Sequence, residues 1–172
     1  MRLLGVLYDT SVLSALLDTT HSNHNVAREF VLSLPGNVVE YISVITLAEL
    51  KFGVYLPKVI TGKSLPKLEN MISDAQQYAA VEISPHTAEA YASIKSKMAG
   101  KYLIKANRKH RAKYIEDWTD KNTGKKLQVD ENDLWLCAQS KERGLTLVTS
   151  DPGMQRIADA DKDVELKVLH SQ

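Results

Sequence analysis

Four acidic residues stand at or shortly after the ends of segments that predict β-strands: Asp9, Glu49, Asp133 and Asp151. They are far apart in the chain, but in a parallel sheet the carboxyl ends of the strands meet at one edge, so we expect the four carboxylates to lie together. Carboxylates crowd stably only beside a positive charge, and oxygen ligands suit a hard cation. The four acids therefore predict a Mg²⁺ or Mn²⁺ site in a metal-dependent enzyme.

The elements that must position these acids alternate between strands and helices. Apolar runs predict strands at 3–8, 38–43, 80–83, 145–149 and 164–169. Helical spacing and capping residues predict helices at about 12–17, 23–33, 45–54, 64–78, 85–98 and 130–143, with Pro57 ending or interrupting the third. This alternation is typical of a three-layer α/β/α fold around a central parallel sheet of about five strands.

Composition is that of one soluble domain over residues 1–172, with 44% apolar residues, 25% charged residues and a net charge of +1. The single cysteine, Cys137, excludes an intrachain disulfide and a Cys/His zinc site, and its apolar surroundings predict a buried thiol. No apolar run approaches the ~20 residues that span a bilayer, and the N-terminal run is too short for a signal peptide. We therefore expect a cytoplasmic protein without a membrane partner.

A polar stretch at about 100–129 interrupts the alternation and predicts a basic helical insertion. Six basic residues, with no acid among them, make it the candidate for contacts to RNA phosphates: Lys101, Lys105, Arg108, Lys109, Arg111 and Lys113. Tyr102, Tyr114 and Trp118 are available to stack on bases. The alternative is a solvated charged helix whose aromatic residues pack on the domain.

Each acid, taken alone, has an ordinary structural alternative. Asp9 and Asp133 suit helix N-termini, Glu49 suits a helix surface, and Asp151 before Pro152 suits a turn. The four acids together indicate a metal site more specifically than any one of them does, because all four are expected where strands give way to helices.

Three acids compete for one role near the start of the last long helix. Asp133 is preferred because it directly precedes the apolar run, whereas Asp130 suits an N-cap and Glu131 points elsewhere on the helix.

Four motifs resemble, in order and over almost the whole chain, those of PIN-domain ribonucleases, and most closely VapC-type toxins of bacterial type II toxin–antitoxin pairs. They are Tyr8–Ser11, Ser43–Leu50 with Gly53, Asn132–Ala138 and Gly144–Asp151. The insertion at 100–129 departs from compact members of that family.

The resemblance implies a PIN-like fold and a metal-dependent endoribonuclease in which Asp9, Glu49, Asp133 and Asp151 hold one or two Mg²⁺ or Mn²⁺ ions. Four hydroxyl residues beside them would support the acids, water or phosphate: Thr10, Ser11, Thr149 and Ser150. The implied partners are an RNA substrate and a cognate antitoxin protein. A homodimer through the helices at 44–78 is a further expectation.

Other functions remain open from the sequence. The same acids would serve an RNA-processing nuclease without a toxin role, and the fold alone would serve a non-catalytic RNA- or protein-binding module. A phosphatase centred on Asp9 is less consistent, because such a site wants a second acid two residues later, where this chain has Ser11.

Overall fold

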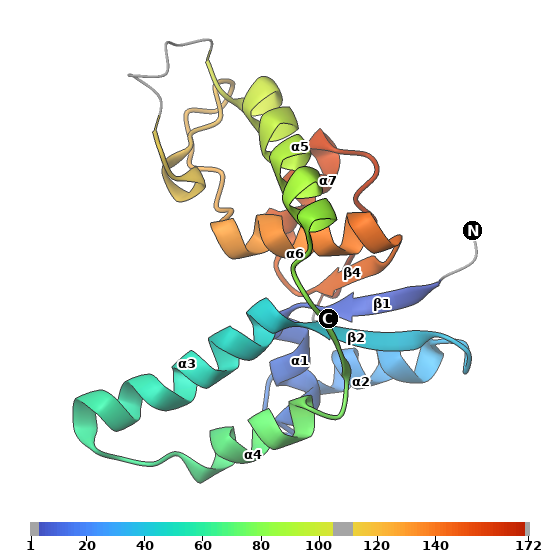
Figure 1. Ribbon diagram of the computed structural model, residues 1–172, viewed down its shortest axis with the longest axis vertical. Helices are drawn as coiled ribbons and strands as arrows, with labels where there is room; N and C mark the ends of the chain where they lie inside the picture. Colours follow the sequence, from blue (N-terminus) through green and yellow to red (C-terminus); the bar gives the residue numbers. More distant parts are fainter. Residues whose placement is uncertain (1–3, 105–111, 171–172) are drawn as a thin grey trace.

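The computed structural model describes residues 4–104 and 112–170, which form a parallel sheet between two layers of helices (Figure 1). The strands are β1 (Gly5–Tyr8), β2 (Val39–Ser43), β3 (Ala79–Val81), β4 (Thr146–Thr149) and β5 (Leu166–Val168). They lie in the order β3-β2-β1-β4-β5, and every neighbouring pair is parallel. The predicted three-layer fold with about five parallel strands is confirmed.

The helices of the described residues divide between the two faces of this sheet. They are α1 (Thr10–Leu17), α2 (His24–Ser33), α3 (Val44–Thr61), α4 (Pro66–Ala75), α5 (Pro85–Tyr102), α6 (Glu131–Arg143) and α7 (Gln155–Ala160), with 3-10 turns η2 (Ile115–Asp117) and η3 (Pro152–Met154). Figure 1 shows α5, α6 and α7 on one side, and α1, α2 and the pair α3–α4 on the other. None of the helices in the described ranges is long and apolar enough to cross a membrane.

Alternation along the central strands builds a separate core under each layer. In β1, Val6 and Tyr8 pack with α1 residues, whereas Leu7 packs with α5 and α6 residues on the opposite face. In β4, Leu147 and Val148 divide in the same way. A strand buried on both faces reads as a continuous apolar run, which is why β1 and β4 are recognisable in the sequence.

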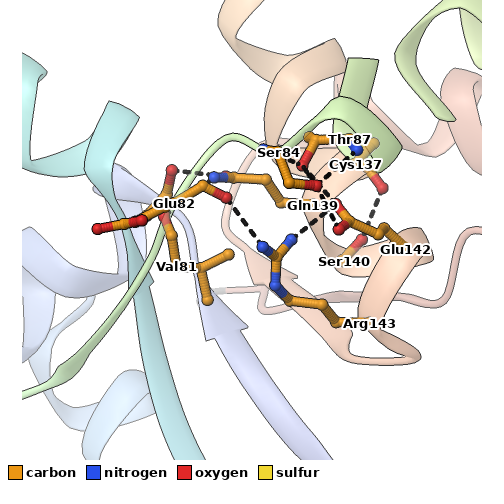
Figure 2. A network of polar contacts seen from close by, with 10 residues as sticks. Val81, Glu82, Ser84, Thr87, Cys137, Gln139, Ser140, Glu142 and Arg143 are labelled. Atoms are coloured by element: carbon orange, nitrogen blue, oxygen red, sulfur yellow. Dashed lines mark hydrogen bonds and ion pairs between the residues drawn. The ribbon is translucent and has the colours of Figure 1, made fainter. Parts of the chain in front are cut away.

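A polar network fixes α6 against the segment that joins β3 to α5 (Figure 2). The Glu142 carboxylate accepts hydrogen bonds from the hydroxyls of Ser84 and Thr87. The fully buried Gln139 donates to the Val81 carbonyl at 3.0 Å and accepts from the Ser43 hydroxyl at 2.6 Å. Because Ser43 is also the N-cap of α3, Gln139 ties the two helices that carry Asp133 and Glu49.

Three local features differ from the sequence predictions. Pro57 neither ends nor interrupts α3, which continues to Thr61. A proline has no N–H to donate to the Gly53 carbonyl, but Gly53 is exposed, so water can donate that hydrogen bond instead. The turn η3 and the short helix α7 were not predicted. Six helical residues are too few to show a period.

The insertion also differs from a continuous basic helix. Helix α5 ends at Tyr102, and the described residues 112–129 form only the turn η2 and an isolated antiparallel bridge between Thr119 and Lys126. The described part is rich in residues that prefer turns, such as Asp120, Asn122 and Gly124. Residues 105–111, which hold most of the predicted basic run, lie outside the described residues.

Candidate functional site

Asp9 lies at the junction of β1 and α1 and is held by three donors. Its side chain accepts hydrogen bonds from the Thr10 N–H at 2.6 Å, the Ser11 hydroxyl at 2.8 Å and the Thr149 hydroxyl at 2.6 Å. Only 8% of the residue is exposed. The N-cap role expected as an alternative is therefore real, but Oδ2 is also shared by hydroxyls from α1 and β4, so Asp9 joins two parts of the sheet edge.

Asp151 is positioned by the same hydroxyls. Its N–H donates to the Thr149 hydroxyl at 3.0 Å, and the N–H of Ser150 donates to the Ser11 hydroxyl at 3.1 Å. The Asp151 carboxylate accepts from the Gly153 N–H at 2.7 Å, as the N-cap of η3. Ser150 contributes its backbone N–H to this arrangement.

Asp133 begins α6 in a reciprocal capping box with Asp130. The N–H of Asp133 donates to the Asp130 carboxylate, and the N–H of Asp130 donates to the Asp133 carboxylate, both at 2.9 Å. Burial, followed by repulsion from the carboxylates of Asp130, Asp9 and Asp151, raises the pKa of Asp133 to about 7, against the lowering effect of the Asp130 N–H. The structure thus brings Asp9, Asp133 and Asp151 within electrostatic reach of one another.

Glu49 is held by two side chains from other helices. The Thr10 hydroxyl donates to Oε2 of Glu49, and the Asn132 amide donates to Oε1 at 2.6 Å. Asn132, next to Asp133, is a site residue that the sequence did not single out. Because the contact spans α3 and α6, only the folded arrangement reveals it.

The acids line two adjoining surfaces of the molecule. Asp133 and Asp151 line a cleft of about 270 Å³ with Asp130, Val129, Glu116, Lys126 and Gln128. Glu49 and Asn132 instead line an apolar groove beside α3 with Phe52 and Ile83. The four predicted acids do not share a single cavity: Thr10 links Asp9 with Glu49, Thr149 links Asp9 with Asp151, and Asp133 hydrogen-bonds to Asp130.

The donor set fits a hard divalent cation by its chemistry. Buried or half-buried carboxylates raise the pKa of a neighbour where no compensating charge lies beside them, and oxygen ligands suit Mg²⁺ and Mn²⁺. Among the described residues, no group of three or more His, Cys, Asp or Glu side chains is arranged so that it could hold a metal ion. The fit of these carboxylates to a cation is therefore one of ligand type.

The other acid near the start of α6 has a different environment. The Glu131 carboxylate accepts hydrogen bonds from Tyr91 and Lys95, and the Tyr91 ring stacks on Trp135 with centroids 4.1 Å apart. Glu131 is therefore ion-paired with Lys95 on α5.

Few of the predicted RNA-binding residues lie where their geometry is described. Lys105, Arg108, Lys109 and Arg111 lie outside the described residues. Lys101 donates to the Asp159 carbonyl at 2.7 Å, and the exposed Lys113 lies 5.0 Å from the ring centroid of Tyr114.

Two of the three aromatic residues predicted to stack on bases are inaccessible. Tyr102 is 6% exposed and Trp118 is 4% exposed, because both pack into the core beneath α5. Only Tyr114 is exposed, at 54%. Base stacking is therefore wrong for Tyr102 and Trp118, and the alternative, in which the aromatic residues pack on the domain, is confirmed for these two.

Comparisons with known proteins identify the family and the fold. The model of the PIN domain family matches residues 6–160. A search of curated proteins found no match.

Among solved structures, VapBC2 from Rickettsia felis, bound to a DNA fragment from its promoter, matches with 19% identity and a TM-score of 0.63, covering 96% of this chain and 98% of that chain. FitAcB from Neisseria gonorrhoeae matches with 23% identity and a TM-score of 0.57, covering 94% and 95%. VapBC-5 from Mycobacterium tuberculosis, of the VapBC family of toxin-antitoxin systems, matches with 20% identity and a TM-score of 0.54, covering 97% and 98%. At these identities the matches show a shared fold.

Proposed function

Because the chain belongs to the PIN domain family, we propose that it is a metal-dependent endoribonuclease that hydrolyses RNA phosphodiester bonds. The main support for the proposal is the convergence of Asp9, Asp133 and Asp151 near the carboxyl edge of the sheet. Burial, and then repulsion from nearby carboxylates that include Asp9 and Asp151, raises the pKa of Asp133 to about 7. Carboxylates crowded in this way suit a hydrolase that uses a hard cation, because the cation would offset their charge.

Some residues of the site would bind the metal, and others orient the residues that bind it. Asp9, Asp133 and Asp151 would hold one or two Mg²⁺ or Mn²⁺ ions, which supply an activated water and stabilise charge on the phosphate. Thr149 and Ser11 keep Asp9 oriented through their hydroxyls.

Glu49, the fourth acid, has a different role. With both carboxylate oxygens already accepting hydrogen bonds from Thr10 and Asn132, Glu49 is placed to orient a water or to complete the ligand set by exchanging one of these donors.

A cleavage assay tests this proposal. Purified protein should cleave single-stranded RNA with Mg²⁺ or Mn²⁺, and EDTA should stop the reaction. Asp9→Asn should reduce cleavage at least a hundredfold, while Glu29→Gln, an equal charge change at an exposed site on α2, should leave it unchanged. Cleavage that persists in EDTA would refute the metal mechanism.

We also propose that the chain is the toxin of a toxin–antitoxin pair. The sequence motifs resemble VapC-type toxins, and the structural matches include members of toxin–antitoxin systems. Helix α3 supports a protein partner, because it exposes a run of large apolar side chains: Phe52 (63%), Tyr55 (59%), Leu56 (40%), Val59 (83%) and Ile60 (70%). Contiguous exposed apolar surface of this kind marks an interaction site.

The product of an adjacent reading frame is the partner to test. Co-expressed with this chain, it should co-purify in stoichiometric amount and suppress RNA cleavage. Val59→Asp should weaken the complex about tenfold or more, as expected from loss of one buried apolar side chain. Leu32→Asp, at an exposed leucine on α2, is the matched control. A complex indifferent to Val59→Asp, or a homodimer that buries α3 instead, would contradict this assignment.

A further inference from the structure

The insertion contributes most of the wall of the acidic cleft. Residues that line the cleft beside Asp133 and Asp151 come largely from the segment 116–130: Glu116, Lys126, Gln128, Val129 and Asp130. This segment follows the stretch in which the sequence predicted RNA contacts, but it reaches the acids directly. The insertion is thus part of the candidate site.

This wall is firmly attached to the domain. Ile115, Trp118, Leu127 and Val129 are buried in the core shared by α5 and α6. The Leu127 N–H donates to the Trp118 carbonyl at 2.9 Å, and the Trp118 indole donates to the Ala112 carbonyl at 3.0 Å. The backbone that carries residues 126 and 128 is therefore held in place beside the acids.

The backbone also makes an unusually close approach at this point. Gln128 has φ of 56°, in the left-handed region that is unfavourable for a side chain, and it is the only such non-glycine residue in the described ranges. A Cβ added to Gly153 would lie 2.8 Å from the Gln128 carbonyl oxygen and 3.0 Å from Oδ1 of Asp151. Glycine at 153 thus allows the wall to touch the loop that carries Asp151.

Lys126 is the one cation among the residues that line the cleft, where four carboxylates also lie: Glu116, Asp130, Asp133 and Asp151. Its amine lies 3.1 Å from the Asp117 carboxylate, and the two side chains are 65% and 58% exposed. An ion pair this exposed contributes little and exchanges easily. A phosphodiester that enters an acidic cleft needs positive charge to offset the carboxylates, and this amine can leave Asp117 to provide it.

We propose that Lys126 binds a phosphate of the substrate RNA strand at the mouth of the acidic cleft, and so positions the strand over Asp133 and Asp151. This inference rests on the proposed ribonuclease function and adds a substrate-binding residue from the insertion. Lys126 carries no proton in the reaction and acts by holding the backbone.

A binding measurement tests this role without requiring cleavage. Anisotropy of a fluorescein-labelled oligouridylate in EDTA gives the affinity at several salt concentrations. Lys126→Gln should weaken binding about three- to tenfold and reduce the salt slope by about 0.7, as expected for one phosphate contact to a single strand. Lys126→Arg keeps the positive charge and should bind with the affinity and the salt slope of the wild type. Lys125→Gln removes the same charge from the exposed neighbouring residue, which does not line the cleft, and should change affinity less than about twofold.

Steady-state cleavage in Mg²⁺ or Mn²⁺ provides the second readout. Lys126→Gln should raise KM with little change in kcat, because the lysine positions substrate without touching the reacting atoms. Equal effects of Lys126→Gln and Lys125→Gln, or a wild-type chain that does not bind the probe, would overturn the inference. If Lys126→Gln weakens binding and Lys125→Gln does not, but neither the wild type nor any variant cleaves RNA with Mg²⁺ or Mn²⁺, the ribonuclease proposal fails. The phosphate-binding role of Lys126 then stands.

Discussion

Neutralising Asp133 should stabilise the metal-free protein. Its pKa of about 7, against an ordinary value of 3.8, corresponds to about 4 kcal/mol of unfavourable free energy once the carboxyl is ionised in the folded state. Asp133→Asn removes the charge, while the amide oxygen can still accept the hydrogen bond from the Asp130 N–H. Loss of the favourable interaction of a carboxylate with the N-terminus of α6 subtracts roughly 0.5–1 kcal/mol. We expect a net gain of about 1–3 kcal/mol.

The gain should depend on pH in a defined direction. The folded protein holds the Asp133 proton more tightly than the unfolded chain, so its contribution to stability falls as pH rises from about 4 to about 7 and is constant above. The stabilisation by Asp133→Asn should therefore grow between pH 5 and pH 7 and level off by pH 8.

Thermal unfolding with EDTA is the appropriate assay. For a chain of this length, the gain at pH 8 corresponds to a rise in Tm of roughly 3–9 °C. Glu29→Gln should leave Tm within about 1 °C of the wild type, as usual for an isolated surface change. A variant that is no more stable than the wild type at pH 8, or whose gain shrinks from pH 5 to pH 8, would refute the electrostatic reasoning.

Two further substitutions, both measured by urea unfolding, test the supports of the site. Gly153→Ala should destabilise the protein by roughly 1–3 kcal/mol and slow RNA cleavage, because the added Cβ pushes on the Gln128 carbonyl and on Asp151. The control is Gly100→Ala in α5, where the added Cβ meets nothing within 4 Å; it should be neutral or stabilising. Gln139→Leu should cost roughly 2–4 kcal/mol in urea unfolding, since it strands the Ser43 hydroxyl and the Val81 carbonyl in the core, and an effect under about 1 kcal/mol would show that the buried amide is dispensable.

The sequence predicted the frame of the site because that frame depends on local patterns. An apolar run that ends in Asp9, and another that ends two residues before Asp151, place both acids at the carboxyl edge of a parallel sheet. The capping role of Asp130 was also predictable, because an acid three residues before Asp133 matches the spacing of an N-cap.

The contacts across the site were not predictable because they join segments distant in sequence. Asn132 meets Glu49 only once α6 has packed beside α3, and the buried Gln139 fixes that packing. The sequence left base stacking and packing on the domain both open for Trp118 and Tyr102, and only the fold shows that they pack. Lys126 and Gln128 reach the acids through a turn whose path the periodicity does not encode.

In the proposed mechanism, Asp9, Asp133 and Asp151 together hold a divalent cation. Calorimetric titration of the EDTA-treated, dialysed protein with Mn²⁺ tests it most directly. We predict saturable binding of one or two ions per wild-type chain, unchanged in Glu29→Gln and lost or weakened at least tenfold in Asp9→Asn, with circular dichroism confirming that each variant is folded. A wild-type chain that binds no Mn²⁺, or an Asp9→Asn variant that binds Mn²⁺ as tightly as the wild type, would contradict a metal site built on these three acids.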